Sequence, residues 1–259
     1  MNLFDLSAKV AVVTGGSKGI GKAICKRLAE HGANVVVSSR KLDVCEAVAA
    51  EIKASGGNAA AHACNIADKE QLRSLVTFAN ATFGGIDILV CNAAVNSYFG
   101  PSVDMPEEAF DRVIGCNVRS NFLLCNMVLP GMAKRGGGAV IIMSSIGGFL
   151  GSDVLGAYAL SKAADLQLAR NIAVEWGGRN IRGNCIAPGL VRTDFSKALW
   201  ENEKILEAAV RTTPMRRIGE ADEIAGAAVF LASAAGNFMN GQTIIIDGGR
   251  LAGAPRANL

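Results

Sequence analysis

The chain has 259 residues, of which half are hydrophobic and 30 are glycine, and its formal net charge is +3. A charge this small, without a cluster of Lys and Arg on one face, argues against a nucleic acid or an anionic membrane as the partner. No apolar run approaches the roughly 18 residues of a membrane-spanning helix, and the N-terminus lacks the basic and apolar regions of a secretory signal.

Seven cysteines are scattered through the chain without a C-x-x-C pair, and there are only two histidines, His31 and His62. An odd number of cysteines in mostly apolar segments indicates buried thiols in a reducing compartment, so we expect a cytoplasmic protein. A metal site is not expected, because the two histidines lie in unrelated places. A Ser-His-Asp hydrolase is disfavoured for the same reason, and because no G-x-S-x-G motif occurs.

Residues 9–14, KVAVVT, form a short β-branched apolar run that predicts a buried parallel strand. The run leads into the glycine-rich stretch 15–21, GGSKGIG, and then into a helical pattern that Gly32 closes. This order favours a dinucleotide site, because glycines let the backbone approach a pyrophosphate and the helix N-terminus offers free N–H groups. The spacing is G-x-x-x-G-x-G instead of G-x-G-x-x-G, so an ordinary glycine-rich turn is the alternative.

The end of the next predicted strand, 34–38, indicates which dinucleotide is bound. An NAD site usually has Asp or Glu there to hold the ribose 2′-hydroxyl. Here the sequence reads Ser38, Ser39, Arg40 and Lys41, which suits a 2′-phosphate because Arg can bind it through two charge-assisted hydrogen bonds. Lys18, inside the glycine turn, could reach the same phosphate. We therefore expect NADP(H), with NAD(H) as the alternative.

The rest of the chain alternates strands with helices and shows no repeat or domain boundary. Strands are expected at 59–64, 86–91, 139–144, 181–187 and 242–247, and helices at about 42–56, 68–83, 106–134, 156–176 and 220–233. Repeated β–α–β units predict a single domain, 1–259, with the Rossmann fold: a doubly wound, seven-stranded parallel sheet with helices on both faces. We expect its core at about 6–249, a lid at 190–217 and a loose tail at 250–259.

Tyr158 and Lys162 lie one turn apart in the predicted helix 156–176, so their side chains share a face. Ionising a free tyrosine, whose pKa is near 10, costs roughly 4 kcal/mol at pH 7. A lysine charge at about 5 Å returns on the order of 3 kcal/mol at an effective dielectric of about 20. The pair can therefore act as a general acid and base near neutral pH. Taken alone, the pattern also fits a tyrosine packed along a lysine stem on a helix surface.

Two further polar residues stand close to this pair in the predicted fold. Ser145 follows the strand 139–144 and could hold the same substrate oxygen. Asn117 lies in the apolar middle of the predicted helix 106–134, where its amide must find hydrogen-bond partners.

Together these motifs resemble the classical short-chain dehydrogenase/reductase family over about residues 6–249. The resemblance rests on the stretches 14–21 (TGGSKGIG), 91–94 (CNAA), 158–162 (YALSK), 188–189 (PG) and 247–249 (DGG), with Asn117, Ser145 and Thr193. It implies that Tyr158 is the acid/base and that Lys162 lowers its pKa and binds the nicotinamide ribose. It also implies that Ser145 holds the substrate oxygen and that Asn117 anchors a water in a proton relay.

The resemblance adds cofactor contacts to those expected of Lys18, Ser39 and Arg40. The residues concerned are Thr14, Gly15, Ser17, Gly19, Ile20, Asn65, Ile66, Asn92, Ala93, Tyr158, Lys162, Pro188, Gly189, Val191 and Thr193. Three positions depart from the family pattern. Cys91 and Ala94 replace the first Asn and the Gly of N-N-A-G, and Asn65 stands where an Asp often accepts a hydrogen bond from the adenine amino group.

Within the family, the segments 38–41, 134–138 and 179–190 resemble NADPH-dependent carbonyl reductases of the dehydrogenase/reductase member four type. Bacterial 3-oxoacyl-acyl-carrier-protein reductases are also similar. The resemblance implies an oxidoreductase that moves a hydride between NADP(H) and a ketone or secondary alcohol, assembled as a homotetramer. An apolar substrate pocket is expected from Phe149, Leu155, Phe195 and Trp200.

Three other functions stay open at this point. One is a 3-oxoacyl thioester reductase, and another is an NAD-dependent secondary-alcohol dehydrogenase. The third is a nucleotide-binding protein without catalysis, which is disfavoured because Tyr158 and Lys162 are both present.

Overall fold

Seven strands are present in the computed structural model, which describes residues 2–253. They are β1 (Val10–Thr14), β2 (Asn34–Ser39), β3 (Asn58–Ala63), β4 (Ile88–Cys91), β5 (Gly138–Met143), β6 (Ile181–Pro188) and β7 (Thr243–Ile246). Every neighbouring pair is parallel, and the order across the sheet is β3-β2-β1-β4-β5-β6-β7. The predicted doubly wound, seven-stranded parallel sheet is therefore confirmed.

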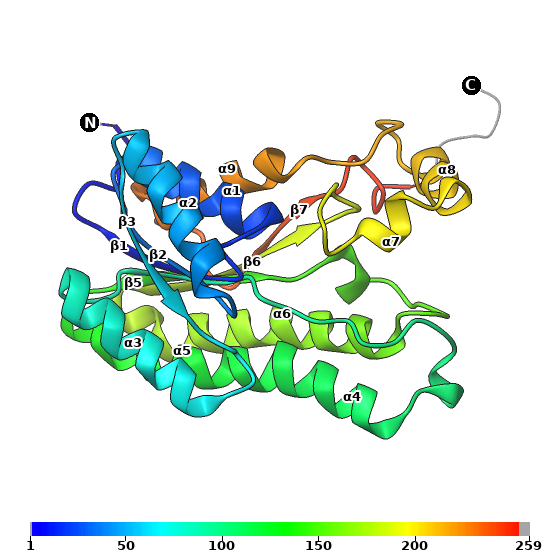
Figure 1. Ribbon diagram of the computed structural model, residues 1–259, viewed down its shortest axis with the longest axis horizontal. Coiled ribbons are helices and arrows are strands. Elements are labelled where there is room, and N and C mark those ends of the chain that lie inside the picture. Colours follow the sequence, from blue (N-terminus) through cyan, green and yellow to red (C-terminus); the bar gives the residue numbers. More distant parts are fainter. Residues whose placement is uncertain (1, 254–259) are drawn as a thin grey trace.

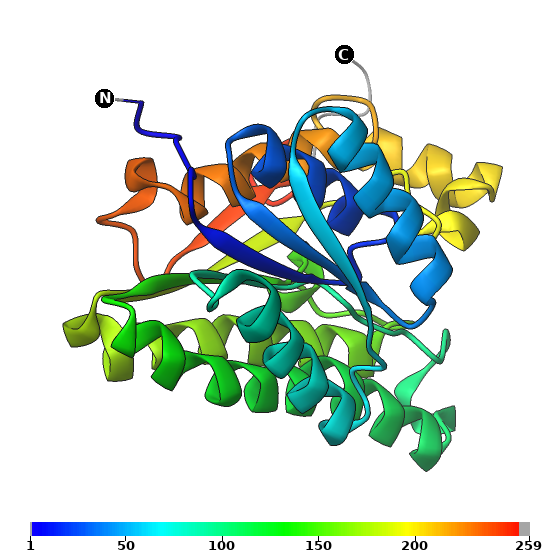
Figure 2. The same cartoon turned by 60° about the vertical axis from the view of Figure 1, so that its left-hand side comes forward.

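Nine α-helices connect and flank these strands within residues 2–253. They are α1 (Gly19–Glu30), α2 (Leu42–Ala54), α3 (Lys69–Phe83), α4 (Glu107–Ile114), α5 (Ser120–Lys134), α6 (Gly156–Trp176), α7 (Lys197–Trp200), α8 (Glu203–Thr212) and α9 (Ala221–Ala232). Helices α1, α2 and α9 cover one face of the sheet, and α3, α5 and α6 cover the other (Figures 1 and 2). None of the described helices is long and apolar enough to cross a membrane.

The two hydrophobic layers follow from the alternation of side chains along each strand. Val13 of β1 and Ile141 of β5 pack toward α1 and α9, whereas Val12 and Ile142 pack toward α3, α5 and α6. Both faces of the sheet are thus buried, as the continuous apolar runs predict.

The strand order reverses at β1. From there the chain adds β2 and β3 on one side, and β4 to β7 on the other. The loops after β1 and β4 therefore leave the sheet in opposite directions, and a crevice opens at the carboxyl ends of these strands. Helices α4, α7 and α8 lie at this end of the molecule (Figure 1).

The prediction of one continuous helix over 106–134 is wrong at its centre. A five-residue π-helical turn, Gly115–Arg119, separates α4 from α5. The amide of Asn117, inside this turn, forms hydrogen bonds with the backbone of Val95. A π turn holds one extra residue, and such turns often occur at functional sites.

The predicted tail begins with an ordered turn. Asp247 Oδ2 accepts a hydrogen bond from Leu251 N at 2.7 Å, just after β7. Residues 254–259 of that tail lie outside the described part of the chain.

Two glycines let α6 lie close to the sheet. A Cβ on Gly183 of β6 would be 2.8 Å from Ile172 Cβ and 2.9 Å from Ala169 O of α6. A Cβ on Gly148, in the loop after β5, would be 2.9 Å from the backbone carbon and oxygen of Lys162. Because both neighbours include helix backbone, a side chain at either position would force α6 away from the sheet.

We expect Gly183→Ala to lower the free energy of unfolding by about 1–3 kcal/mol, because the added methyl overpacks the contact between β6 and α6. Denaturant unfolding at a fixed protein concentration would measure the change. Gly226→Ala on α9 is the matched control, since an added Cβ there meets nothing within 4 Å and should stabilise the helix by about 0.5–1 kcal/mol. Equal stability of the two variants would show that a methyl group at position 183 does not disturb the packing of α6 against β6.

Candidate active site

The glycine turn after β1 forms a backbone cradle at the reversal point of the sheet. Gly15 and Gly19 have φ angles of +65° and +50°, in the left-handed region that glycine adopts without strain. A Cβ on Gly21 would lie 2.2 Å from Gly15 O. The turn leads into α1, whose first N–H groups have no partners within the helix. A cradle of this kind fits the phosphates of a dinucleotide.

Thr14 and Asn92 hold this turn against the loop after β4. Thr14 Oγ1 accepts hydrogen bonds from Asn92 N at 3.0 Å and from Ala93 N at 3.1 Å. The Asn92 amide donates to Thr14 O at 3.0 Å and to Gly15 O at 3.2 Å. Asn92 therefore joins the two loops that flank the crevice.

The end of β2 presents polar side chains and no carboxylate. Ser38 Oγ is buried and is, within the described residues, the one buried side-chain oxygen without a hydrogen-bond partner. Ser39 Oγ lies 3.1 Å from Cys45 Sγ, and Arg40 and Lys41 are exposed. Buried polar atoms normally have partners, so this end of the strand fits a ligand that carries hydrogen-bonding groups.

Lys18, which was expected to reach the 2′-phosphate, forms an ion pair in this structure. Its Nζ lies 2.8 Å from Asp194 Oδ2, and both side chains are exposed. The Lys18 ammonium holds the pKa of the Asp194 carboxyl below its usual value, mainly through this hydrogen bond. Lys18 therefore joins the glycine turn to the predicted lid.

The segment after β6 closes the other side of the crevice. Pro188 ends β6 and Val191 is buried. A Cβ on Gly19 would lie 3.0 Å from Thr193 Cγ2, so this segment lies against the glycine turn. The other residues expected to bind the cofactor lie in the same loops or after β3: Ser17 and Ile20 in the turn, Asn65 and Ile66 after β3, Ala93 after β4, and Gly189 after β6. Their contacts with a cofactor stay a prediction.

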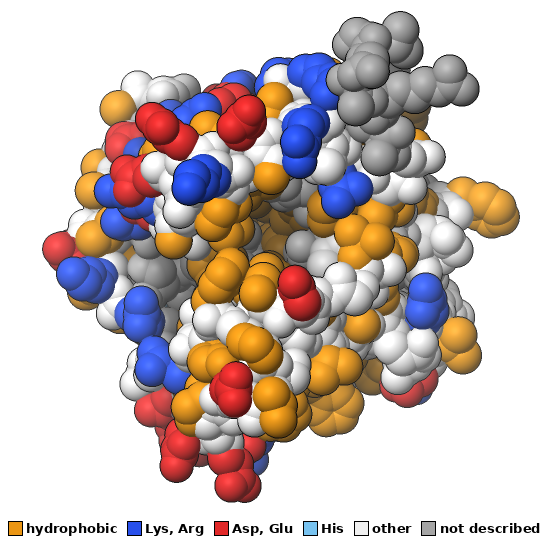
Figure 3. Space-filling model, turned by 90° about the vertical axis from the view of Figure 1, so that its right-hand side faces the viewer, with side chains coloured by type: hydrophobic (Ala, Val, Ile, Leu, Met, Phe, Trp, Pro, Cys, Tyr) orange, Lys and Arg blue, Asp and Glu red, His pale blue; other side chains and the backbone are white. Residues whose placement is uncertain are grey.

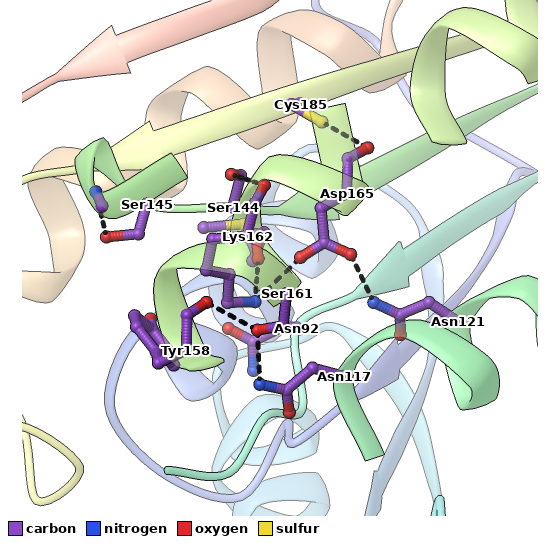
Figure 4. Close-up of polar contacts among 12 residues, drawn as sticks. Asn92, Asn117, Asn121, Ser144, Ser145, Tyr158, Ser161, Lys162, Asp165 and Cys185 are labelled. Atoms are coloured by element: carbon purple, nitrogen blue, oxygen red, sulfur yellow. Dashed lines mark hydrogen bonds and ion pairs between the residues drawn. The ribbon is translucent and has the colours of Figure 1, made fainter. Parts of the chain in front are cut away.

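Tyr158 and Lys162 come together in the first turns of α6, as predicted from their spacing. Lys162 Nζ lies 5.7 Å from the centroid of the Tyr158 ring. The Lys162 side chain is 3% exposed, and its Nζ donates a hydrogen bond of 2.7 Å to Met143 O at the end of β5. The lysine is thus not a surface residue with a tyrosine along its stem (Figure 4).

The carboxylate beside this lysine was not predicted from the sequence. Asp165 Oδ2 lies 2.9 Å from Lys162 Nζ, and the Asp165 side chain is 1% exposed. Asn121 Nδ2 of α5 donates to Asp165 Oδ1 at 3.0 Å. A signal was present, because Asp165 stands three residues after Lys162 on the same helix face.

The two charges are buried together. Burial by itself lowers the pKa of the Lys162 ammonium, but the Asp165 charge opposes this, and the pKa lies above its ordinary value. Burial raises the pKa of the Asp165 carboxyl, while Lys162 and Asn121 act against the rise. Removing one member of such a buried pair leaves an uncompensated charge, which is strongly unfavourable.

Ser145 and Asn117 both have hydrogen-bond partners within the described residues. Ser145 Oγ accepts a hydrogen bond from Gly147 N at 3.1 Å, which leaves its O–H able to donate. The Asn117 amide accepts from Val95 N at 2.8 Å and donates to Val95 O and to Ser161 Oγ. Both N–H groups of the amide therefore have partners, and the side chain ties the loop after β4 to α6.

The predicted apolar pocket residues separate into two groups. The ring centroids of Phe195 and Tyr158 are 6.1 Å apart, and Phe149 lies exposed in the loop after β5. Leu155 directly precedes α6. Trp200 instead donates from Nε1 to Thr193 O at 2.9 Å and packs under Arg192, so it braces the predicted lid. Figure 3 shows a hollow on this side of the molecule, bordered by hydrophobic side chains.

Comparisons with known proteins agree with this geometry. A family model described as enoyl-(acyl carrier protein) reductase matches residues 15–250. Dehydrogenase/reductase SDR family member 4 of Bos taurus is 43% identical over 246 residues, which cover 95% of this chain and 88% of that protein.

Two solved structures are similar along nearly their entire length. A 7α-hydroxysteroid dehydrogenase in complex with NADH and 7-oxo glycochenodeoxycholic acid has a TM-score of 0.92 and 39% identity, and covers 99% of this chain and 98% of its own. A gluconate 5-dehydrogenase from Burkholderia cenocepacia J2315 in complex with NADP and tartrate has a TM-score of 0.93 and 31% identity, with 98% and 99% covered. Identity at this level over almost all of the sequence, on the same fold, shows that this chain belongs to the short-chain dehydrogenase/reductase family of oxidoreductases.

Proposed function

We propose that the protein transfers a hydride between NADP(H) and a ketone or secondary alcohol, with Tyr158 as the general acid and base. The observation that carries this proposal is the buried Lys162 ammonium, 5.7 Å from the centroid of the Tyr158 ring. A buried cation at this range attracts the negative charge that develops on the Tyr158 oxygen during proton transfer, because the surrounding protein screens the attraction less than water does. The bound nicotinamide supplies or accepts the hydride.

The residues of the chain then handle the proton and the substrate oxygen. In reduction, Tyr158 gives its phenolic proton to the oxygen that becomes the alcohol, and in oxidation it takes that proton back. The Ser145 O–H holds the same oxygen in place. Asn117 keeps the loop after β4 beside Tyr158 through its two hydrogen bonds with Val95. Lys162, held by Met143 O, keeps its position while the charge on Tyr158 changes.

Removing the Tyr158 hydroxyl tests this role. Tyr158→Phe should lower kcat by at least about 1000-fold, since general acid–base catalysis contributes roughly 100- to 10000-fold. NADPH consumption with the fastest ketone of a panel would measure it, and NADPH binding by fluorescence should persist. Tyr98→Phe is the control, because it deletes the hydroxyl of the other tyrosine, which donates to Pro101 O. Full turnover by Tyr158→Phe would exclude the assignment.

The preference for NADP(H) is supported by the end of β2. Arg40 is exposed and forms no ion pair with a carboxylate of the described residues, and no Asp or Glu stands at positions 38–41. The relatives include both cofactors, since the hydroxysteroid dehydrogenase was solved with NADH and the gluconate dehydrogenase with NADP. An NAD-dependent secondary-alcohol dehydrogenase is therefore the alternative.

Arg40→Ala should lower kcat/KM for NADPH by about 10- to 100-fold and leave that for NADH nearly unchanged, because a bidentate charged contact with the 2′-phosphate is lost. Arg179→Ala, at the far end of α6, is the control for loss of an exposed arginine. A wild-type protein that oxidises NADH faster than NADPH would overturn the cofactor proposal.

We propose a hydrophobic ketone as the substrate, on the basis of Phe149, Leu155 and Phe195 around the crevice. The sequence resemblance to bacterial 3-oxoacyl-acyl-carrier-protein reductases makes a 3-oxoacyl thioester the second candidate. A panel of aliphatic, aryl, steroid and acetoacetyl-thioester ketones would separate the two. NADPH binding without turnover on any carbonyl would instead indicate a nucleotide-binding protein without catalysis.

We also propose a cytoplasmic homotetramer built from this single domain. All seven cysteines are free and buried, as expected in a reducing compartment. The outer faces of α5 and α6 expose Phe122, Leu160 and Val174, and Ile245 is exposed on the edge strand β7. Exposed apolar side chains at such spacing on a helix face fit a partner surface.

Sedimentation should give a mass about four times the 26.8 kDa of one chain. Val174→Glu should reduce this mass, because it places a charge where α6 would meet another copy. Val103→Glu is the control, since Val103 is also exposed but lies outside α5 and α6. A wild-type monomer would contradict the proposal.

A further inference from the structure

Asp165 is a buried carboxylate that the proposed chemistry does not use. It lies on α6, on the face packed against the sheet, close to apolar side chains such as Leu166 and Cys185. Replacing a buried ion pair by apolar residues is often neutral or stabilising. The need for a stable fold therefore does not explain a charge at this position, and its contact with Lys162 must be considered.

The hydrogen bonds around Lys162 define what the carboxylate does. An ammonium has three N–H donors, and two of them are directed to Met143 O at 2.7 Å and to Asp165 Oδ2 at 2.9 Å. Ser144 Oγ also donates to Lys162 O at 2.8 Å, which fixes the backbone of this turn. One N–H has no partner among the described residues, and Nζ lies 5.7 Å from the centroid of the Tyr158 ring (Figure 4).

We propose that Asp165 is a positioning residue for Lys162: held by Asn121, its carboxylate turns the ammonium toward Tyr158 and balances its charge in the buried site. The inference rests on the proposed function for the roles of Tyr158 and Lys162. Asn121 contributes to the same positioning, because its amide donates a hydrogen bond to Asp165 Oδ1, the carboxylate oxygen that Lys162 does not contact.

The other groups near Lys162 do not supply this balance. Cys185 of β6 and Cys91 of β4 lie near Lys162 and Asp165. Cys125 of α5 has its Sγ 4.0 Å from Cys91 Sγ. Burial raises the pKa of Cys185, and the contact with Cys125 together with burial raises that of Cys91, so both thiols are neutral. Asp165 is thus the carboxylate that faces Lys162, with Tyr158 as the remaining titratable partner.

Loss of the carboxylate changes the titration of the site in a defined direction. Burial acts to lower the pKa of the Lys162 ammonium, and the Asp165 charge is the main effect that opposes this. Without that negative charge, the site loses its first proton at a lower pH. A residue that only filled space would change the rate or the stability without moving this midpoint.

The kinetic test is the pH dependence of kcat/KM for NADP+-dependent oxidation of the alcohol that corresponds to the fastest ketone. Asp165→Asn should move the midpoint of the acid limb down by about one pH unit. Asp165→Glu, which keeps the charge, should restore a midpoint close to that of the wild type. Glu175→Gln removes an exposed carboxylate from the same helix and is the matched control. An unchanged midpoint in Asp165→Asn would overturn the proposal.

A second readout uses the ligand-free protein. In Asp165→Asn the Lys162 ammonium is buried without a counter-charge, so its folded-state pKa falls below the unfolded value. The resulting penalty is fully present at low pH and is relieved as the pH rises through the folded-state pKa. The deficit in Tm relative to the wild type should therefore be smaller at pH 9 than at pH 6, by about 3 °C. A deficit equal at both pH values would assign Asp165 to packing alone.

The two tests separate the inference from the function on which it rests. A wild type that turns over no carbonyl would overturn the proposed function, while the melting comparison still decides the role of Asp165. If Asp165→Asn does not fold, ¹³C labelling of lysine Cε in the wild type replaces it, with Lys162→Met for assignment. The Lys162 signal should then show no titration between pH 6 and pH 9, and a titration in that range would overturn the proposal.

Discussion

The close approach of α6 to the sheet is the constraint on which the active site depends. Gly183 and Gly148 have no side chains to keep the helix away, and Ser144 Oγ holds the carbonyl of Lys162 at 2.8 Å. In this position the lysine ammonium reaches the last carbonyl of β5, and Tyr158 comes to the open end of the crevice. The packing of α6 against the sheet thus sets the positions of Tyr158 and Lys162.

A charge carried into this layer must be matched. The layer between the sheet and α3, α5 and α6 is mostly apolar, so an ammonium without a partner there would be strongly destabilised and would tend to lose its proton. Asp165 and Met143 O together occupy two of the three donors, and Asn121 satisfies the second carboxylate oxygen. Each of these polar atoms has a partner, so the arrangement is rigid and the remaining donor has a defined direction.

Much of this molecule was predictable from the sequence, for local reasons. The bounds of α6, Gly156–Trp176, were predicted as found, because apolar spacing and a preceding strand define a helix without long-range information. The π turn at Gly115–Arg119 was not, since the apolar pattern runs through it and the turn depends on contacts with Val95. The pairing of Lys18 with Asp194 joins residues 176 positions apart, a distance over which spacing carries no information.

Two ion pairs near the site differ in burial, and therefore in how strongly they hold their residues in place. Lys18 and Asp194 are about two-thirds exposed, so water screens their attraction and the bond contributes little. Because the pair is weak, it would not prevent Lys18 from binding the cofactor phosphate that we propose beside the glycine turn. The side chains of Lys162 and Asp165 are at most 3% exposed, and loss of either one would leave the other charge buried without a partner. The buried pair therefore fixes the position of Lys162, whereas the exposed pair constrains the segment after β6 only weakly.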